Sequence, residues 1–263
     1  MDYKNKIVWI TGASSGIGEA LSLDLSKRGA KLILSARRED ELIRVKNLCE
    51  NPSFVQVLPF DLMDIPSLES TTHQAVKLFG RIDMLINNGG ISQRSLVCDT
   101  PLEIDRRIME VNFFSYVAIT KALLPYMIKQ NYGHIVVTSS ILGKIGVSLR
   151  SAYASSKHAL HGFYDSLREE VLENNIKITM VCPGWIKTNV TINAITETGQ
   201  AYNKMGDGQS KGMEPSKCAS KIIRAISKNK TEVYIGGYET YTIYFKRYLP
   251  GLYLKVVRLF KTT

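Results

Sequence analysis

Short runs of aliphatic and β-branched residues alternate with stretches of helix length through the first half of the chain. The apolar runs are KIVWIT at 6–11, KLILSA at 31–36, FVQVL at 54–58 and IDMLIN at 82–87. The stretches between them cover 16–29, 39–50 and 65–80. This alternation is typical of a parallel sheet covered by helices on both faces. It predicts an α/β fold with a doubly wound parallel sheet.

The second half continues the alternation. A long helical stretch is expected at 101–130, and strands are expected at HIVVTSS (134–140), IKITMVCP (176–183) and EVYIGG (232–237), with a helix from Pro215. No linker, repeat or low-complexity segment divides the chain. We therefore expect residues 1–263 to form a single Rossmann-type domain with about seven strands.

One segment breaks the pattern. Residues 189–213 are rich in Gly, Asn, Thr and Gln and show no period of a helix or strand. Ligands of open parallel sheets bind beyond the carboxyl ends of the strands, where long loops gather. We interpret 189–213 as a mobile substrate loop.

The composition is that of a globular protein, with 44% hydrophobic and 22% charged residues. The four cysteines, Cys49, Cys98, Cys182 and Cys218, have no CxxC pair and no neighbouring histidine cluster, so we expect neither a disulfide framework nor a metal site. The start of the chain lacks the features of a signal peptide, and no run of about 20 apolar residues predicts a spanning helix. The expected location is cytoplasmic.

A glycine-rich turn, TGASSGIG, separates the first strand from the first helix and contains Gly12, Gly16 and Gly18. Glycines let the backbone approach a pyrophosphate, and the helix N-terminus behind them offers free N–H groups. Within a βαβ unit this pattern indicates dinucleotide binding. The alternative is a tight turn without a ligand.

The end of the second strand distinguishes two dinucleotides. In NAD sites an Asp or Glu there binds the ribose 2′-hydroxyl, whereas an Arg accommodates a 2′-phosphate. The sequence LSARRED places Ala36 where the acid would stand, followed by Arg37 and Arg38. A guanidinium binds phosphate through paired hydrogen bonds, so NADP(H) is favoured. Alternatively, these arginines only neutralise Glu39 and its acidic neighbours.

Polar residues follow the next strands at the same expected edge. Residues 87–90 read NNGG, Ser139 and Ser140 end another strand, and Tyr153 lies four residues before Lys157 in the sequence SAYASSKHAL. Positions i and i+4 of a helix lie one above the other, so the phenol and the ammonium can share one target. Alternatively, the pair lies on a solvated helix face.

In combination, TGxxxGxG, NNxG, the Asn of EVN (Asn112), Ser140, YxxxK and PGWIKT resemble the signature of the short-chain dehydrogenase/reductase family, classical type, over about residues 5–190. The resemblance implies that Tyr153 is the proton donor or acceptor and that Lys157 lowers its pKa and holds the nicotinamide ribose. It implies that Ser140 binds the substrate oxygen and that Asn112 anchors a proton-relay water. Alternatively, Asn112 bonds its own helix backbone and Ser140 is a cap, and we expect His158 and His161 to be ordinary helix-face residues.

The resemblance also implies a set of cofactor contacts, from the pyrophosphate through the adenine and its ribose to the nicotinamide amide. With the glycine turn and the two arginines, the expected cofactor-binding residues are Gly12, Ser14, Ser15, Gly16, Ile17, Gly18, Arg37, Arg38, Asp61, Leu62, Asn88, Gly89, Gly90, Tyr153, Lys157, Pro183, Gly184, Ile186 and Thr188. The family usually has Ala at the position of Gly89. Loss of that methyl is expected to loosen packing beside the cofactor.

The segments NNGGISQRSL and LILSARREDEL are similar to those of a branch with membrane-associated steroid and retinoid reductases and 11β-hydroxysteroid dehydrogenases. Members of this branch usually carry an N-terminal membrane anchor, which we do not find in this sequence. The family usually pairs subunits through two long central helices, which implies a homodimer or homotetramer.

The net charge of +10 is partly concentrated in residues 241–263, which hold five Lys or Arg and no acid among aromatic and aliphatic residues. Pro250 and Gly251 divide this C-terminal extension into two amphipathic pieces. The pattern favours either a peripheral membrane contact or docking on the protein's own subunits. Nucleic acid is not expected, because no binding motif accompanies the charge.

These features predict an NADP(H)-dependent oxidoreductase that interconverts a carbonyl and an alcohol by hydride transfer, with Tyr153 as general acid or base. The aliphatic stretch ILGKIGVSL at 141–149 favours an apolar small-molecule substrate of steroid, retinoid or lipid type. The alternative is a redox sensor or scaffold that binds NADP(H) without catalysis.

Overall fold

The computed structural model describes residues 2–257, which form one seven-stranded parallel sheet. Its strands are β1 (Ile7–Thr11), β2 (Lys31–Ser35), β3 (Val55–Val57), β4 (Met84–Asn87), β5 (Gly133–Thr138), β6 (Ile176–Pro183) and β7 (Glu232–Ile235). Their order is β3-β2-β1-β4-β5-β6-β7, and all neighbours are parallel. The strand order reverses between β1 and β4, which is where α/β sheets open a crevice for ligands. The predicted fold is confirmed.

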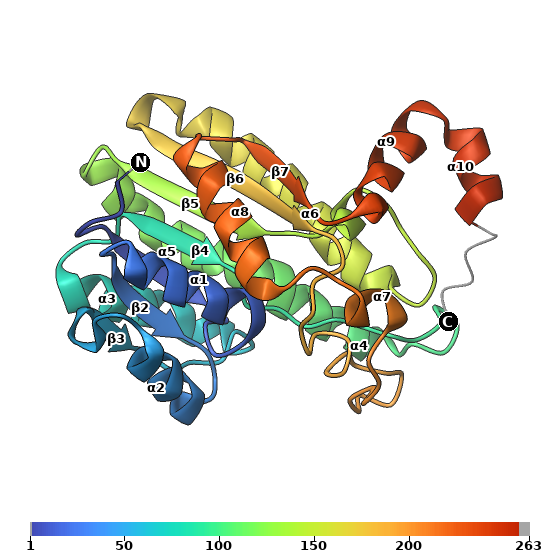
Figure 1. Ribbon diagram of the computed structural model, residues 1–263, viewed down its shortest axis with the longest axis horizontal. Helices are drawn as coiled ribbons and strands as arrows, with labels where there is room; N and C mark the ends of the chain where they lie inside the picture. The colour runs from blue at the N-terminus through green and yellow to red at the C-terminus, as the bar shows by residue number, and fades with distance from the viewer. Residues whose placement is uncertain (1, 258–263) are drawn as a thin grey trace.

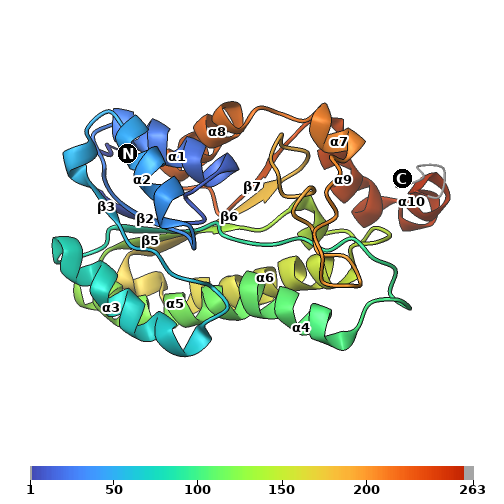
Figure 2. The same cartoon turned by 90° about the horizontal axis from the view of Figure 1, so that it is seen from below.

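Helices cover both faces of the sheet (Figure 2). On one face lie α1 (Gly16–Lys27), α2 (Glu39–Leu48) and α8 (Pro215–Ser227). On the other lie α3 (Leu68–Phe79), α4 (Leu102–Met109), α5 (Ser115–Lys129) and α6 (Ser151–Glu170). The five inner strands β2, β1, β4, β5 and β6 therefore supply apolar side chains to two cores.

The alternation of side chains along β1 shows how the two cores divide. Val8 and Ile10 pack with Leu21 and Leu25 of α1 in one core. Trp9 packs with Ile33 and Leu85 in the other, together with residues of α5 and α6. Because successive strand residues point to opposite faces, an uninterrupted apolar run is what a strand buried on both faces requires.

The stretch predicted as one helix at 101–130 is continuous but irregular. A π-helical turn, Glu110–Phe114, lies between α4 and α5 and contains Asn112. Within residues 2–257, the segment Leu102–Lys129 is the one helix long and apolar enough by composition to span a membrane. Its Tyr116, Ile119 and Leu123 are buried in the core beneath the sheet, as in the core helix of a globular domain.

The segment 189–213 is largely irregular, as its composition predicts, but it is better packed than a purely polar loop. Ala194 and Ile195 are buried, and Ile195 forms an isolated bridge with Gln93. A single helical turn, α7 (Asp207–Ser210), lies near its end. The apolar pair inside the polar segment therefore docks the loop on the residues that follow β4. Its role as a substrate loop remains a prediction.

The C-terminal extension forms two short helices, α9 (Tyr241–Tyr248) and α10 (Pro250–Val257), which stand apart from the layers of the sheet (Figure 1). Pro250 begins α10 because the first helical position needs no backbone N–H donor. Ile243 is buried against Ile141 and Ile145, which fixes α9 to the body. Residues 258–263, which complete the predicted extension, lie outside the described residues.

His134 of β5 is a buried polar residue whose protonation state the surroundings determine. The Thr179 hydroxyl donates to Lys230 O, so the 2.9 Å contact between His134 Nε2 and Thr179 Oγ1 needs the hydrogen on Nε2. Nδ1 is buried without a partner, so a second proton would find no acceptor. Burial and, to a smaller extent, the charge of Lys177 lower the pKa of His134 to about 4.

We expect His134→Val to make the stability of the protein less sensitive to acid. Between about pH 6.5 and pH 4 the unfolded chain binds a proton at His134 that the folded chain does not, so acid favours unfolding. The group can account for up to about 3 kcal/mol of that loss. Urea unfolding at about pH 7 and pH 4.5 should show a smaller decrease for the variant than for the wild type. The exposed His158 provides a control, and an equal decrease in His134→Val and His158→Ala would contradict the assignment.

Candidate active site

One cleft of about 1160 Å³ follows the carboxyl edge of the sheet. Thr11, Ser35, Thr138 and Pro183, the last residues of β1, β2, β5 and β6, all line it. At one end it reaches Arg37 and Arg38, and at the other it reaches the C-terminal helices. Nearly every predicted site residue lines this cleft; the exceptions are Gly18 and Asn112.

The glycine turn has the backbone that its sequence predicts. Gly12 and Gly16 have φ values of 66° and 59°, in the left-handed region that favours glycine. Ser15 is the N-cap of α1, and its side chain makes no capping hydrogen bond, so the first-turn N–H groups remain available to a ligand. Ser14, Ser15, Gly16 and Ile17 line the cleft there. These features fit a pyrophosphate at the helix N-terminus.

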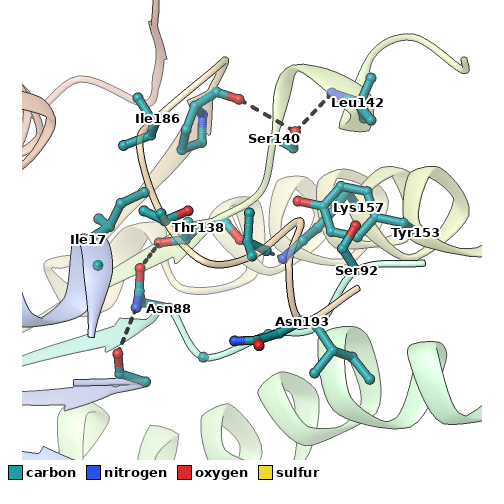
Figure 3. Close-up of a pocket in the computed structure, with 18 of the residues that line it drawn as sticks. Ile17, Asn88, Ser92, Thr138, Ser140, Leu142, Tyr153, Lys157, Ile186 and Asn193 are labelled. Atoms are coloured by element: carbon teal, nitrogen blue, oxygen red, sulfur yellow. Dashed lines mark hydrogen bonds between the residues drawn. The ribbon is translucent and has the colours of Figure 1, made fainter. Parts of the chain in front are cut away.

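Gly18 has a packing role instead. A Cβ atom there would collide with Gly12 O, so only glycine lets α1 approach the turn so closely. Asn88 holds the same turn from β4, because its side-chain amide donates to Thr11 O at 3.2 Å and to Gly12 O at 3.3 Å. In Figure 3 the side chain of Asn88 lies between the β1 turn and Thr138. Asn88, which follows β4, therefore stabilises the turn that follows β1.

The packing around Gly89 differs from the expectation. A Cβ atom at this position would lie 2.8 Å from Leu62 Cδ1 and 3.1 Å from Gly12 N. The backbone of Gly89 is also fixed, since its N–H donates to Thr11 Oγ1 and its carbonyl accepts from the Tyr116 hydroxyl. The prediction of loose packing is therefore wrong: Leu62 and the glycine turn occupy the space of the missing methyl.

Arg37 and Arg38 line the cleft, are exposed, and form no ion pair within residues 2–257. Glu41, one of the acids that could have neutralised them, pairs with Arg44 at 2.8 Å. Asp61 and Leu62 lie along the same end of the cleft. Two cationic side chains are therefore available to bind an anion at the end of β2.

The structure brings Ser140, Tyr153 and Lys157 together midway along the cleft (Figure 3). Ser140 is the N-cap of the turn Ile141–Gly143, where its hydroxyl accepts from Leu142 N at 3.1 Å and makes a long contact with Pro183 O at 3.4 Å. The alternative prediction, that Ser140 caps a helical turn, therefore describes its local structure correctly. It does not exclude a ligand contact, because Ser140 also lines the cleft and its hydroxyl can rotate.

Lys157 is 3% exposed, and its Nζ donates to Thr138 O at 2.9 Å. The ammonium lies 5.4 Å from the centre of the Tyr116 ring and 5.8 Å from that of Tyr153. Burial lowers the pKa of Lys157 to about 7, and the nearby Cys182 opposes that shift. The reading of this pair as residues on a solvated face is wrong, because the ammonium is buried beneath the cleft.

Three effects act on the pKa of the Tyr153 phenol. Burial raises its pKa, while a hydrogen bond with the Ser140 hydroxyl and the positive charge of Arg150 oppose that rise. The phenol is therefore the ordinary form of Tyr153 at neutral pH in the absence of a ligand. A phenol is the form needed to donate a proton to a carbonyl oxygen.

Asn112 lies behind this group and outside the cleft. Its side-chain amide is paired with the backbone of Ile91, donating to Ile91 O and accepting from Ile91 N at 2.9 Å each, and it also donates to Ser156 Oγ. A Cβ atom at Gly90 would lie 2.9 Å from Asn112 Oδ1 and 3.7 Å from Lys157 Nζ, so these groups are close together. The alternative that Asn112 bonds its own helix is not what the structure shows.

The segment after β6 closes the opposite side of the cleft. Pro183, Gly184, Ile186 and Thr188 line it, and a Cβ atom at Gly16 would lie 3.0 Å from Thr188 Cγ2. Ile186 forms an isolated bridge with Met213. Thr188 thus lies directly across from the glycine turn.

Sequence reasoning missed several residues around this site. Arg150, three residues before Tyr153, is 9% exposed and lines the cleft beside Ser92. His161 is buried, with Nε2 3.1 Å from Ser139 Oγ, and is not an ordinary helix-face residue. The Ser139 hydroxyl in turn donates to Lys157 O. The sequence does show a cation three residues before Tyr153, and this was a usable signal for Arg150. Nothing close to His161 in the sequence indicates its contact with Ser139.

No group of three or more His, Cys, Asp or Glu side chains within residues 2–257 could hold a metal ion. All four cysteines, which lie inside this range, are free thiols, and three of them are buried.

The fold and the cleft are those of a Rossmann-type, nucleotide-binding oxidoreductase. The family model for short chain dehydrogenases matches residues 6–198. The chain is 41% identical over 258 residues to a dehydrogenase/reductase SDR family protein 7-like of Drosophila melanogaster, covering 96% of this chain and 79% of that protein. It is 43% identical over 252 residues to the human dehydrogenase/reductase SDR family member 7, covering 93% and 74%.

A crystal structure of a short-chain dehydrogenase from Streptomyces avermitilis superposes with a TM-score of 0.83 at 25% identity, covering 98% of this chain and 97% of the other. The chain belongs to the short-chain dehydrogenase/reductase family. Members of this family are NAD(P)-dependent oxidoreductases of carbonyl and alcohol substrates, which confirms the predicted class of enzyme.

Proposed function

We propose that the protein is an NADP(H)-dependent oxidoreductase that interconverts a ketone or aldehyde and its alcohol, with Tyr153 as the general acid and base. The observation that carries the proposal is the meeting of Tyr153, Ser140 and Lys157 in one cleft with the glycine turn. Neither the cofactor preference nor the roles of these residues follow from membership of the family, so each needs its own support.

The residues present fit a dinucleotide along the carboxyl edge of the sheet. Free N–H groups at the start of α1 would bind its pyrophosphate. Asp61 and Leu62 would contact its adenine, and residues 88–90 would contact the adjoining ribose. Ile186 and Thr188 suit the nicotinamide amide, and Lys157 the nicotinamide ribose. When bound, the nicotinamide would supply or accept the hydride.

The protein's own residues would hold the substrate and move its proton. In reduction, the Tyr153 phenol donates its proton to the substrate oxygen, and the Ser140 hydroxyl donates a hydrogen bond to the same oxygen. In oxidation the phenolate accepts that proton, and the Lys157 ammonium beside the ring stabilises the phenolate charge. Asn112 would support a water next to Lys157 through its place behind Gly90.

The walls beyond Tyr153 support an apolar substrate body. Ile145, Val147 and Leu149, from the segment 141–149, line the cleft with Val111 and Val190. Burial of an aliphatic or ring system between such side chains is worth roughly 25 cal/mol per Å² of apolar area. A substrate of steroid, retinoid or lipid type would gain most from these walls.

We expect Tyr153→Phe to lower kcat by about 100-fold to 10,000-fold, the usual contribution of general acid or base catalysis. NADP(H) binding should persist, because the phenyl ring remains in place. NADPH oxidation with a panel of ketones, aldehydes, steroids and retinoids measures the first effect, and fluorescence titration measures the second.

The same variant separates this proposal from a non-catalytic redox sensor or scaffold. Tyr126→Phe, on the exposed side of α5, is the matched control. If the wild type turns over no substrate of the panel with either nicotinamide, or if Tyr153→Phe keeps wild-type activity, the enzymatic proposal fails.

For the cofactor, Arg37→Asp should reverse the preference from NADPH toward NADH. An acid at this strand end repels a 2′-phosphate and accepts a hydrogen bond from a ribose 2′-hydroxyl. Loss of a charge-assisted contact changes the ratio of kcat/KM values by about tenfold to a hundredfold. Arg106→Asp, at an exposed position of α4 outside the cleft, controls for the change of net charge. A preference unchanged in Arg37→Asp would place the 2′-phosphate elsewhere or favour NAD.

We further propose that the protein is cytoplasmic and that α9 and α10 touch a membrane surface peripherally. Tyr241, Tyr248 and Leu252 are exposed, and residues 241–257 hold Lys246, Arg247 and Lys255 with no acid. Exposed aromatic and aliphatic side chains interspersed with cations suit the interface of an anionic bilayer.

Tyr248→Ser with Leu252→Ser should reduce co-flotation with vesicles that contain anionic lipids, since it removes exposed apolar area but no buried contact. Leu96→Ser with Val97→Ser, at exposed positions of another segment, is the control. Equal partitioning of both double variants would contradict the membrane contact. Docking between subunits is the competing role of this extension.

A homodimer or homotetramer paired through α4, α5 and α6 is the assembly that the family favours. Exposed Phe114, Tyr126 and Ile128 on this helix layer support it. A monomeric mass by light scattering would contradict it.

A further inference from the structure

The part of the cleft beyond Tyr153 carries an excess of positive charge. Arg94, Arg107 and Arg150 line it from three different elements. Among the described side chains, the acid that lines this end is Glu239, and its carboxylate already accepts hydrogen bonds from the backbone N–H groups of Trp185 and Gly237. None of the three arginines forms an ion pair with a side chain that the structure describes.

Arg150 is the most deeply placed of the three. Its Nη1 donates to Ser92 Oγ at 2.7 Å and to Gln93 O at 2.6 Å, and both acceptors are neutral. Its Nε and Nη2 have no acceptor among the described residues. Burial and then the positive charge of Arg94 lower the pKa of Arg150, so the two guanidinium groups are near enough to repel each other.

Arg94 is half-buried, and its Cζ atom lies 4.6 Å from the centre of the Tyr202 ring. Tyr202 belongs to the segment 189–213. Its guanidinium donates no hydrogen bond to any group that the structure describes, and Arg94 lines the cleft, so its N–H groups are available to a ligand. Stacking on an aromatic ring and planar recognition of an anion are compatible uses of one guanidinium.

A third unpaired donor lies at the same end. Tyr253 of α10 is 5% exposed and lines the cleft, and its hydroxyl is buried without a partner. Buried polar groups are almost always paired, so a set of donors without acceptors indicates a ligand rich in acceptors. A buried cation without an anion is also costly, and an anionic ligand removes that cost.

We propose that the substrate of this enzyme is an amphipathic carbonyl compound that carries an anionic group, a carboxylate or a phosphate, and that Arg150 and Arg94 bind this group. The inference rests on the proposed carbonyl reduction and adds the chemical class of the substrate. Ile145, Val147 and Val190 enclose the apolar part. Since Arg150 lies one turn of helix before Tyr153, the anion lies within a few bonds of the reacting carbonyl.

The test compares ketones with the same chain whose head groups are anionic or neutral. The probes are 4-oxodecanoic acid, its methyl ester and 4-oxodecyl phosphate, each of which carries a ketone. Each probe is used with NADPH and below its micelle concentration. We expect the acid, the phosphate or both to exceed the ester in kcat/KM by about tenfold to a hundredfold, the range of charge-assisted hydrogen bonds. Preference for one anion over the other identifies which group the site takes.

Variants locate the effect at the two arginines. Arg94→Gln removes a guanidinium with no hydrogen bond to lose, and it should lower the acid-to-ester ratio about tenfold, mainly through KM. Arg150→Met should lower it at least as much, and Arg150→Lys should retain part of the preference. Arg106→Gln, on α4 outside the cleft, should leave the ratio unchanged.

A binding experiment keeps the inference independent of turnover. Trp185 lines the cleft, so its fluorescence should respond to decanoate and to decyl phosphate at lower concentrations than to decanol. If no ketone reacts at all, the proposed function has failed. In that case the fluorescence titration by itself tests whether the anion site exists. Preference for the ester and for decanol, or ratios unchanged in both Arg94→Gln and Arg150→Met, would overturn the inference.

Discussion

Lys157 is 3% exposed, and within the part of the chain that the structure describes the one hydrogen-bond acceptor of its ammonium is Thr138 O at 2.9 Å. A buried cation is costly unless other groups stabilise it, and burial accordingly lowers the pKa of this lysine to about 7. The surrounding residues reduce the cost only in part: Tyr116 and Tyr153 present ring faces to the ammonium. In the proposed mechanism, the hydroxyl groups of a bound nicotinamide ribose and the phenolate of Tyr153 would stabilise this cation further.

The bond to Thr138 also links α6 to the sheet. Thr138 ends β5, and the next residue, Ser139, donates to Lys157 O, so β5 and α6 are joined by two opposed hydrogen bonds. His161 contacts Ser139 from below and lies 3.5 Å from Glu232 of β7. The position of Lys157 therefore depends on strands at the carboxyl edge, and an open parallel sheet offers its site at that same edge.

The sequence predicted those parts of the site that depend on local backbone. The glycine turn, the strand ends and the i, i+4 pair on α6 are each defined by neighbours in the chain, so TGASSGIG and YASSK were sufficient. Arg150, His161 and the space beside Gly89 depend on residues far away in sequence: Ser92, Glu232 and Leu62, respectively. The docking of Ile195 on Gln93 was hidden for the same reason, because a polar composition does not show where one buried side chain will lie.

The two ends of the cleft differ in how their cations are placed. Arg37 and Arg38 are exposed at the end of β2, where water and salt screen their charge. Arg150 is buried, so its charge acts through a lower dielectric and is screened less by solvent, which strengthens its interaction with a group next to Tyr153. Tyr253 brings α10 to the same end, so the helices that stand apart from the sheet also form part of the wall around the ligand. A surface that displaced α10 would therefore change the volume and the donors offered to the substrate, and occupation of the cleft would in turn favour one position of α10.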